Sequence, residues 1–217
     1  MATASGLTST SYALLGLLAV KPWTTYELAQ QMDRTVSRFW PRAKSKVYEE
    51  PKKLVALGLA RSTDDAVGRR RRTIYAITPK GRRALAAWLA EPGDGPVLEY
   101  EQLMKVFFAD SGTTADLRRQ LDAARAWAHE LTLVNIEVGR GYVEGNAPFP
   151  ERAAVNHLVG RFTDDLLETV DRWAEWAAET IADWPEHPRD AAVEREALAE
   201  TVAQATARAE RWRRRRG

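Results

Sequence analysis

The 217-residue chain contains no cysteine, so it can form neither a disulfide framework nor a thiolate metal site. Its three histidines, His129, His157 and His187, are scattered and do not form a metal-binding motif. No glycine-rich loop follows a predicted strand, so the phosphate cradle of nucleotide-binding folds is missing. These absences argue against an enzyme, and we expect no cofactor, no metal ion and no catalytic residue.

Long apolar runs are absent as well. The longest, Tyr12 to Val20, is shorter than the roughly 20 residues that span a bilayer. The first residues, Met1 to Ser11, carry no positive side chain and are not typical of a signal peptide. The sequence therefore predicts a cytoplasmic protein that does not contact membranes, and its 45% hydrophobic content is normal for a folded chain.

The net charge is only +2, but it is unevenly distributed. Residues 1–90 carry 16 Lys and Arg against 6 Asp and Glu, a formal charge of +10. Residues 91–217 carry 16 against 24, a formal charge of −8. This asymmetry indicates that the first part binds an anion and the second packs against something else. Chance segregation of solubilising charge is the alternative, which the clustering of basic residues on particular elements disfavours.

The first ninety residues predict three helices, a two-stranded hairpin and a fourth helix. Thr24 to Glu27 is a capping box that opens the second helix, and Thr78-Pro79 is typical of a helix start. Pro51 lies inside the third helix, where we expect a kink or local loosening. The fourth helix is expected to bury Leu85, Trp88 and Leu89. The expected ranges are 9–20, 24–32 and 42–57 for the first three helices, 59–63 and 73–78 for the strands, and 79–90 for the fourth helix.

The remainder of the chain predicts helices only. Residues 91–96 read as a linker and residues 139–150, rich in glycine and proline, as a break. The segment from Glu151 to Trp184 is long for a globular helix, whose mean length is about 11–12 residues. It must be covered by other helices of this chain or by a second chain, and we take it as the candidate dimer element. The other expected helices are 99–109, 114–138 and 190–212.

Helix, capped helix, lysine-bearing helix, basic hairpin and helix is the order of a winged helix-turn-helix. The run Lys46 to Leu59, with Tyr48, Leu54 and Gly58, resembles the signature of the PadR family of bacterial transcriptional regulators. The closing strand and Thr-x-x-Gly helix start of that family are similar to Arg72–Gly81. Two further resemblances are to the family's first helix and to the opening of its C-terminal region, at Leu14–Leu18 and Leu103–Phe108.

The resemblance implies a mainly α fold: an N-terminal winged helix-turn-helix with a two-stranded wing, and a C-terminal helical dimerisation domain. We expect residues 1–92 to form the DNA-binding domain and residues 97–217 the dimerisation and possible effector-sensing domain. The implied function is a sequence-specific DNA-binding transcriptional regulator, a repressor released by a small-molecule effector. The alternative is a protein-interaction module whose basic half binds an acidic partner. Pro51 departs from the family's apolar residue and is expected to disturb the back half of the recognition helix more than its DNA-facing start.

Two sets of basic residues are the candidate DNA contacts. A recognition helix meets base edges with its N-terminal residues, and by the resemblance Tyr48 donates to a phosphate. Lys52 and Lys53 are further candidates for phosphate contacts, with a solvated surface role as the alternative. The base-edge candidates are Arg42, Lys44, Ser45 and Lys46.

The second set is the arginine block at the hairpin tip, comprising Arg69, Arg70, Arg71 and Arg72. Arginines enter a narrow minor groove, where the potential is most negative. Because side chains alternate along a strand, about two of the four are expected to reach the groove. The others would touch phosphate or pair with Asp64 and Asp65, and a solvated hairpin tip is the alternative.

The expected partners are double-stranded DNA with a palindromic operator, a second copy of the chain, and an aromatic small molecule. Trp127, Trp173 and Trp176 are the candidate effector contacts, although aromatic residues at helical spacing also serve as plain core. Trp23, Trp40 and Trp88 are assigned to the core of the first domain and its junction. The arginine-rich C-terminus has two alternative roles, which are attraction to DNA and pairing with the acidic helices.

Overall fold

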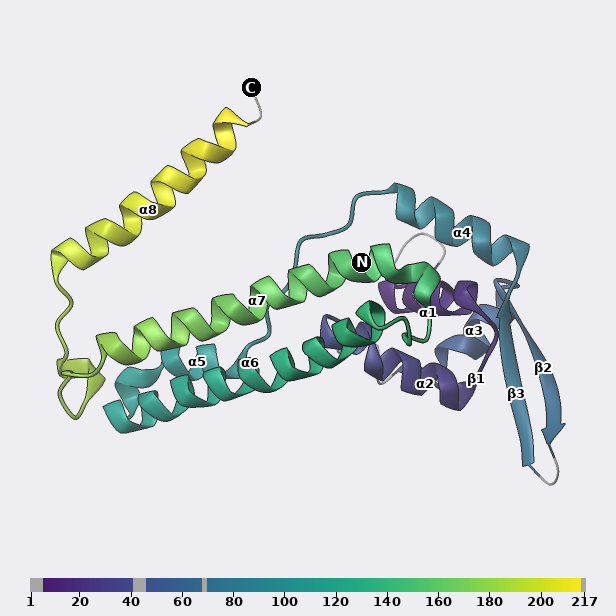
Figure 1. The fold of residues 1–217 in the computed structure, drawn as a ribbon, viewed down its shortest axis with the longest axis horizontal. Helices are drawn as coiled ribbons and strands as arrows, with labels where there is room; N and C mark the ends of the chain where they lie inside the picture. Colours follow the sequence, from purple (N-terminus) through teal and green to yellow (C-terminus); the bar gives the residue numbers. More distant parts are fainter. Residues whose placement is uncertain (1–5, 41–45, 68–69, 216–217) are drawn as a thin grey trace. The chain divides into compact units, whose positions relative to one another are not determined.

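The computed structural model describes residues 6–40, 46–67 and 70–215. The chain divides into two compact units, residues 1–96 and 97–217, and each is described by itself. The first unit contains α1 (Ser9–Val20), β1 (Trp23–Thr24), α2 (Thr25–Arg34), the short 3-10 helix η1 (Val36–Arg38), α3 (Glu50–Ala56), β2 (Ala60–Val67), β3 (Arg70–Ile77) and α4 (Pro79–Ala90) (Figure 1).

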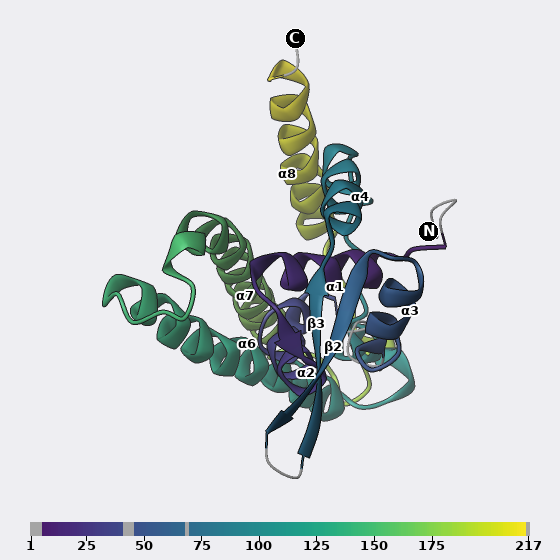
Figure 2. The same cartoon turned by 90° about the vertical axis from the view of Figure 1, so that its right-hand side faces the viewer.

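Three antiparallel strands form the sheet of the first unit, in the order β1-β3-β2. β2 and β3 make the wing, pairing from Ala60 opposite Ile77 to Val67 opposite Arg70, and run side by side along their length (Figure 2). The third strand, β1, was not expected; Trp23 pairs with Tyr75 on β3. A two-residue strand shows no periodicity from which it could be predicted.

The helix starts of the first unit follow from local hydrogen bonds. Thr24 and Glu27 form the expected capping box, with the Thr24 amide donating to Glu27 Oε2 at 2.8 Å. The Thr78 hydroxyl accepts from the Gly81 amide at 3.1 Å, and Pro79 occupies the first turn of α4. Both predicted helix starts are confirmed. α1 also has the bounds expected from its sequence.

The core of the first unit forms around α1, which packs on α3, α4 and β3. Its fully buried apolar side chains include Leu14, Leu15, Leu18, Leu28, Met32 and Leu54. The prediction for α4 was wrong in part, because Leu89 is 67% exposed and Leu85 is only half-buried. Trp88, 37% exposed, stacks on Tyr12 with ring centroids 4.8 Å apart.

Gly81 explains the Thr-x-x-Gly helix start. A Cβ at this position would lie 2.1 Å from the Leu59 carbonyl oxygen and 2.9 Å from Ile77 Cγ1. The same carbonyl accepts hydrogen bonds from the Thr78 amide at 3.0 Å and from the Thr78 hydroxyl at 3.1 Å. The first turn of α4 therefore sits directly against the start of the wing, and a side chain at residue 81 has no room.

The regular elements of the second unit are all helices over its described residues. Its elements are α5 (Glu101–Phe107), η3 (Ala109–Ser111), α6 (Thr114–Val143), η4 (Pro150–Arg152), α7 (Ala153–Thr180), η5 (Pro188–Asp190) and α8 (Arg195–Arg214). The predicted break at 139–150 was wrong in its first part, because α6 continues through Gly139 and Gly141 to Val143. The reversal follows at Gly145, which has a φ of 75°.

α6 and α7 form an antiparallel pair. Leu117 near the start of α6 belongs to the same buried cluster as Ile181 just after α7, together with Leu121, Ala124 and Ala174. The inward stripe expected for α6 is confirmed at its buried residues, which are Leu117, Leu121, Ala124 and Ala128. The stripe expected for α7 is confirmed only near its C-terminal end. Its first half is exposed at Val155, Leu158, Phe162 and Leu166.

No helix within the described ranges is both long enough and apolar enough to span a bilayer.

Candidate nucleic-acid interface

The segment that leads into α3 differs from the expected recognition helix. Among the described residues, Lys46 to Glu49 form a turn, and the regular helix begins only at Glu50. Pro51 occupies the first turn of α3, where its missing N–H breaks no helical hydrogen bond. Of the expected kink or local loosening, the kink was therefore wrong, whereas the turn directly before α3 is a local loosening. The part after Pro51 is regular, and the irregular part precedes it, which also reverses the expectation that the back half would be disturbed.

Glu50 anchors the start of α3 in the core. Its side chain is 9% exposed and accepts a hydrogen bond from the buried Ser11 hydroxyl. Lys53 Nζ lies 3.2 Å from Glu50 Oε1 and donates to the Gly6 carbonyl at 2.7 Å. The Ser11 hydroxyl in turn accepts from the Thr8 amide at 2.9 Å. This network joins the first turn of α3 to the N-terminus of α1 and fixes the orientation of the segment before α3.

Three predicted DNA-contact residues on this segment are exposed. Lys46, Tyr48 and Lys52 all have side chains open to solvent, while Val47 between them is buried. Lys52 lies 3.9 Å from Glu49, and both side chains remain more than two-thirds exposed. The segment therefore has a solvent-exposed side that carries Lys46, Tyr48 and Lys52, and a buried side that carries Val47. Three further predicted contacts lie outside the described residues: Arg42, Lys44 and Ser45.

The wing carries the second predicted set. Arg72 lies on β3 opposite Asp65 and is exposed. The Thr73 hydroxyl donates to Asp64 Oδ1 at 3.1 Å. Arg69 lies outside the described residues. Arg70 and Arg71 belong to β3 by their backbone, where they pair with Val67 and Ala66.

Electrostatics at the base of this surface involve α2. Hydrogen bonds from the Thr24 amide and hydroxyl lower the pKa of Glu27, and the charges of Lys21 and Arg72 act in the same direction. A carboxylate in the first turn of α2 is also stabilised by the positive end of the helix dipole. The charge of Arg72 on the wing is thus the smallest of the contributions that act on Glu27 of α2.

Two tryptophans of the second unit contact Tyr100, a residue which the sequence reasoning missed. Its ring centroid lies 6.3 Å from that of Trp127 and 6.4 Å from that of Trp173. Its hydroxyl is buried and has no hydrogen-bond partner among the described residues, and burial raises the pKa of this phenol. Trp176 is 58% exposed and lies outside these ring contacts. Two of the three candidate tryptophans thus contact a half-buried tyrosine whose buried hydroxyl has no hydrogen-bond partner within the described part of the chain.

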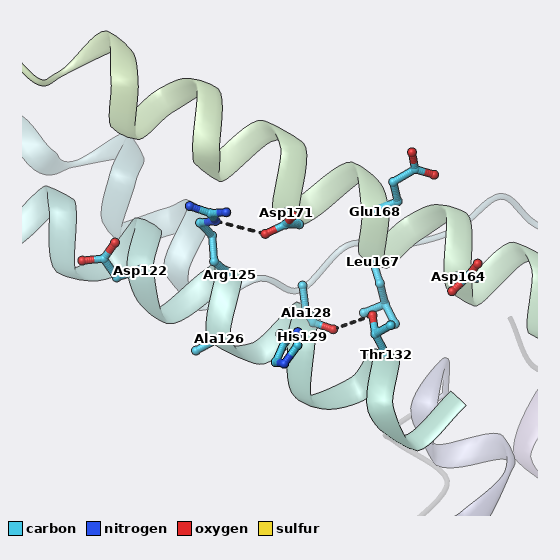
Figure 3. A pocket seen from close by; sticks show the side chains of 10 residues that line it. All are labelled: Asp122, Arg125, Ala126, Ala128, His129, Thr132, Asp164, Leu167, Glu168 and Asp171. Carbon is cyan, nitrogen blue, oxygen red and sulfur yellow. Dashed lines mark hydrogen bonds and ion pairs between the residues drawn. The ribbon is translucent and has the colours of Figure 1, made fainter. Parts of the chain in front are cut away.

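A groove of about 690 Å³ lies along α6 and α7. In Figure 3, Arg125 reaches from α6 toward Asp171 of α7, where its Nε lies 3.0 Å from Oδ1, and Glu168 points away from α6. The groove is rich in carboxylates and none of the candidate tryptophans lines it. Over the described part of the chain, no three His, Asp or Glu side chains come together as a metal site.

Comparison with known proteins identifies the family. The family model described as the transcriptional regulator PadR-like family matches residues 14–87. The probable transcriptional regulator Rv1176c of Mycobacterium tuberculosis is 31% identical over 126 residues, which cover 53% of this chain and 67% of that protein. This chain belongs to the PadR-like family of transcriptional regulators. The resemblance that the sequence carried at Lys46–Leu59 and Arg72–Gly81 is confirmed.

Solved PadR structures share the fold. Bacillus subtilis PadR in complex with operator DNA has a TM-score of 0.69 and 19% identity, covering 80% of this chain and 99% of that one. The same protein in complex with p-coumaric acid has a TM-score of 0.62 and 20% identity, covering 81% and 100%. The expected mainly α fold, an N-terminal winged helix-turn-helix followed by helices, is confirmed. The named members of the family are regulators of transcription.

Proposed function

We propose that this PadR-like protein is a cytoplasmic, homodimeric repressor without enzymatic activity that binds operator DNA through residues 1–92. Residues 97–217 would hold the two copies together and sense an aromatic effector. The observation that carries the proposal is the exposure of basic side chains on both expected contact elements, Lys46 and Lys52 at α3 and Arg72 on the wing. The operator complex of Bacillus subtilis PadR supports this use of the fold.

The proposed contacts follow the geometry of a winged helix on a duplex. The turn before α3 meets base edges in the major groove, and Tyr48 and Lys52 contact phosphates beside it. The wing lies along the minor groove, where arginines are favoured. Buried Val47 and Glu50 hold this segment from behind. The proposed contact residues are Arg42, Lys44, Ser45, Lys46, Tyr48, Lys52, Arg69, Arg70, Arg71 and Arg72.

The salt dependence of DNA binding tests this surface. Neutralising about six to ten phosphates per dimer gives a slope of log affinity against log salt of roughly −5 to −9. We would select bound fragments from genomic DNA and measure their affinity by fluorescence anisotropy across a salt series. Arg72→Ala is expected to weaken binding and reduce the slope by about one for each phosphate contact removed. A wild-type slope near zero would exclude DNA as the ligand.

Arg83→Ala on α4 is the matched control. Arg83 is exposed and belongs to the same unit, but it lies on neither the wing nor the segment before α3. Its removal changes the net charge by the same amount as Arg72→Ala. Equal loss of affinity in both variants would show that binding depends on total charge and not on the proposed surface.

The homodimer is supported by the exposed apolar side of α7. Val155, Val159, Phe162 and Leu166 follow at steps of four, three and four, which places them on one side of the helix. Their side chains are 40–57% exposed. Monomeric proteins seldom leave a contiguous apolar face of this kind in water, so a second copy is its proposed cover. Two half-sites of a palindromic operator require such a two-fold dimer.

The proposed effector is a small aromatic molecule that contacts Trp127 and Trp173, with Trp176 a more peripheral candidate. Support comes from the aromatic cluster around Tyr100 and from the p-coumaric acid complex of Bacillus subtilis PadR. Tryptophan fluorescence titrated with p-coumaric acid and a panel of aromatic compounds tests it. Quenching that disappears in Trp127→Phe but persists in Trp176→Phe would support the cluster as the site. No response across the panel would overturn it.

A further inference from the structure

α8 carries an apolar stripe with the spacing of a coiled-coil seam. Leu198, Val202, Ala205, Ala209 and Trp212 follow one another at steps of four, three, four and three. Such alternation places the residues on one side of a helix, in the a and d positions of a heptad. Leu198 is 54% exposed and Val202 is 65% exposed, and none of the residues of α8 is buried. The side chains of Leu198 and Val202 are thus open to a partner.

The charges of α8 separate along its length. Residues 194–203 contain three glutamates and one arginine, a formal charge of −2. Residues 204–215 contain five arginines and one glutamate, a formal charge of +4. In a parallel pair of these helices like charges would meet at both ends. In an antiparallel pair the acidic start of each helix faces the arginine-rich end of the other, which is the complementary arrangement.

We propose that α8 pairs antiparallel with α8 of a second copy of this chain. The pairing that best fits the stripe sets Leu198 against the partner's Ala209 and Val202 against the partner's Ala205. A large side chain then meets a small one in these two central layers, so the middle of the two seams interdigitates closely, and Trp212 lies opposite the partner's Arg195. The same register brings Glu196 level with the partner's Arg211. This contact is additional to the α7 face and does not depend on it.

Nucleic acid is a poorer occupant of this helix. A duplex would satisfy the arginines at the end of α8, but it would leave Leu198 and Val202 in water. It would also face the glutamates at the beginning of the helix. A second α8 satisfies the apolar stripe and both charged ends together.

Because the chain lacks cysteine, single introduced cysteines test the arrangement in the full-length protein. Leu198→Cys and Ala209→Cys would be prepared with different tags, mixed, exchanged and mildly oxidised. The antiparallel pair predicts a disulfide between the two variants, whereas each variant alone stays unlinked because its own cysteines lie at opposite ends of the pair. Ala203→Cys, at the same level as the middle of the seam but on the outer side, is the control.

The mixed disulfide is expected to form about tenfold faster or more than any Ala203→Cys disulfide, since pairing raises the local concentration of the thiols. Circular dichroism would verify that each variant remains folded. Self-linking of Ala209→Cys would show a parallel pair and overturn the proposal. Absence of the mixed disulfide would show that another surface covers α8. If the Ala203→Cys disulfide formed as fast as the mixed disulfide, both would result from random collisions, and the proposed pairing would be wrong.

Discussion

The two units of this protein satisfy their apolar side chains differently. In the first unit, Leu14, Leu15 and Leu18 of α1 are at most 1% exposed, and polar side chains at the helix starts are hydrogen-bonded within the unit. In the second unit, Leu158 and Phe162 of α7 are 70% and 57% exposed. The core of the first unit around α1 is therefore complete and can hold a basic surface in a fixed geometry, although Leu89 near the end of α4 is exposed. The second unit is complete only when something covers the first half of α7.

This contrast separates two tasks. A surface that reads DNA needs its side chains held by a rigid shell, which the core around α1 and the Glu50 network provide. A surface that sets the spacing between two such readers needs an interface whose packing can change, and exposed helix faces supply one. Variants that disturb either unit test whether this division is correct.

The largest expected effect comes from α7. Phe162→Glu places a charge in the middle of the exposed apolar side and should prevent its burial against a second copy. We expect a monomer in sedimentation experiments, and a loss of operator affinity of about 10²- to 10⁴-fold because the two half-sites are no longer joined. Fluorescence anisotropy with the selected operator would measure the loss.

His157→Glu provides the control for this variant. His157 is also exposed on α7, but it lies on the opposite, charged side of the helix, so a glutamate there should leave association unchanged. If Phe162→Glu sediments like the wild-type protein, α7 does not hold the two copies together. The contrast between a complete and an incomplete unit would then fail.

Sequence reasoning was most successful where a structure depends on neighbours in the chain. The capping residues Thr24 and Thr78 and the bounds of α1 follow from local hydrogen bonds and a local apolar pattern, and all were predicted. The late start of α3 was missed, although a proline is best tolerated in the first turn of a helix and Pro51 could have indicated it. The periodicity of α7 showed which residues are apolar but not what covers them, because covering depends on distant segments or on another chain.

The candidate site shows the same limit. The exposed residues Lys46, Tyr48 and Lys52 were named from their position in the expected recognition helix, and their roles remain proposals. The role of Glu50 was missed. Glu49 and Glu50 are adjacent glutamates, and nothing in the local sequence indicates which of the two side chains turns inward. Tyr100 was missed because its contacts with Trp127 and Trp173 join residues far apart in the sequence.

The next largest effect tests how closely the first unit is packed. Gly81→Ala would place a methyl group 2.1 Å from the Leu59 carbonyl oxygen, so α4 must shift away from the wing. We expect the free energy of unfolding to fall by about 3 kcal/mol, at the upper end of overpacking effects. Thermal or urea unfolding would measure it.

Gly16→Ala is the comparison for that variant. Apart from the chain neighbours of Gly16 and the backbone of α1 itself, no atom lies within 4 Å of a Cβ built at Gly16, in the middle of α1. Alanine there should raise the free energy of unfolding by about 0.5–1 kcal/mol through helix propensity. Similar effects of the two substitutions would mean that the contact at Leu59 does not limit the packing of α4.

A smaller effect is expected at Glu50. Glu50→Ala removes the acceptor of the Ser11 hydroxyl and the partner of Lys53, which should lower the free energy of unfolding by about 1–3 kcal/mol. Glu49→Ala, at an exposed neighbouring position, should be nearly neutral. Urea unfolding of both variants would compare them. Equal stability of both would show that the network does not anchor α3, and the rigid support assigned to the DNA-facing segment would be lost.

The smallest effect concerns the pH dependence of the α2 cap. Hydrogen bonds from Thr24 lower the pKa of Glu27 in the folded protein, so folding favours its charged form. The stability that this carboxylate contributes is fully present above its unfolded pKa and is lost as the pH falls through the lower, folded pKa.

Glu27→Gln should therefore unfold with a free energy that depends less steeply on pH in the acidic range than that of the wild-type protein. The glutamine keeps a side-chain oxygen that can still accept a hydrogen bond from the Thr24 amide. Unfolding free energies measured between neutral and acidic pH would test this. Identical acid dependence of wild type and Glu27→Gln would mean that the cap is not held by the ionised carboxylate, and the local completeness of the first unit would have to rest on its apolar core alone.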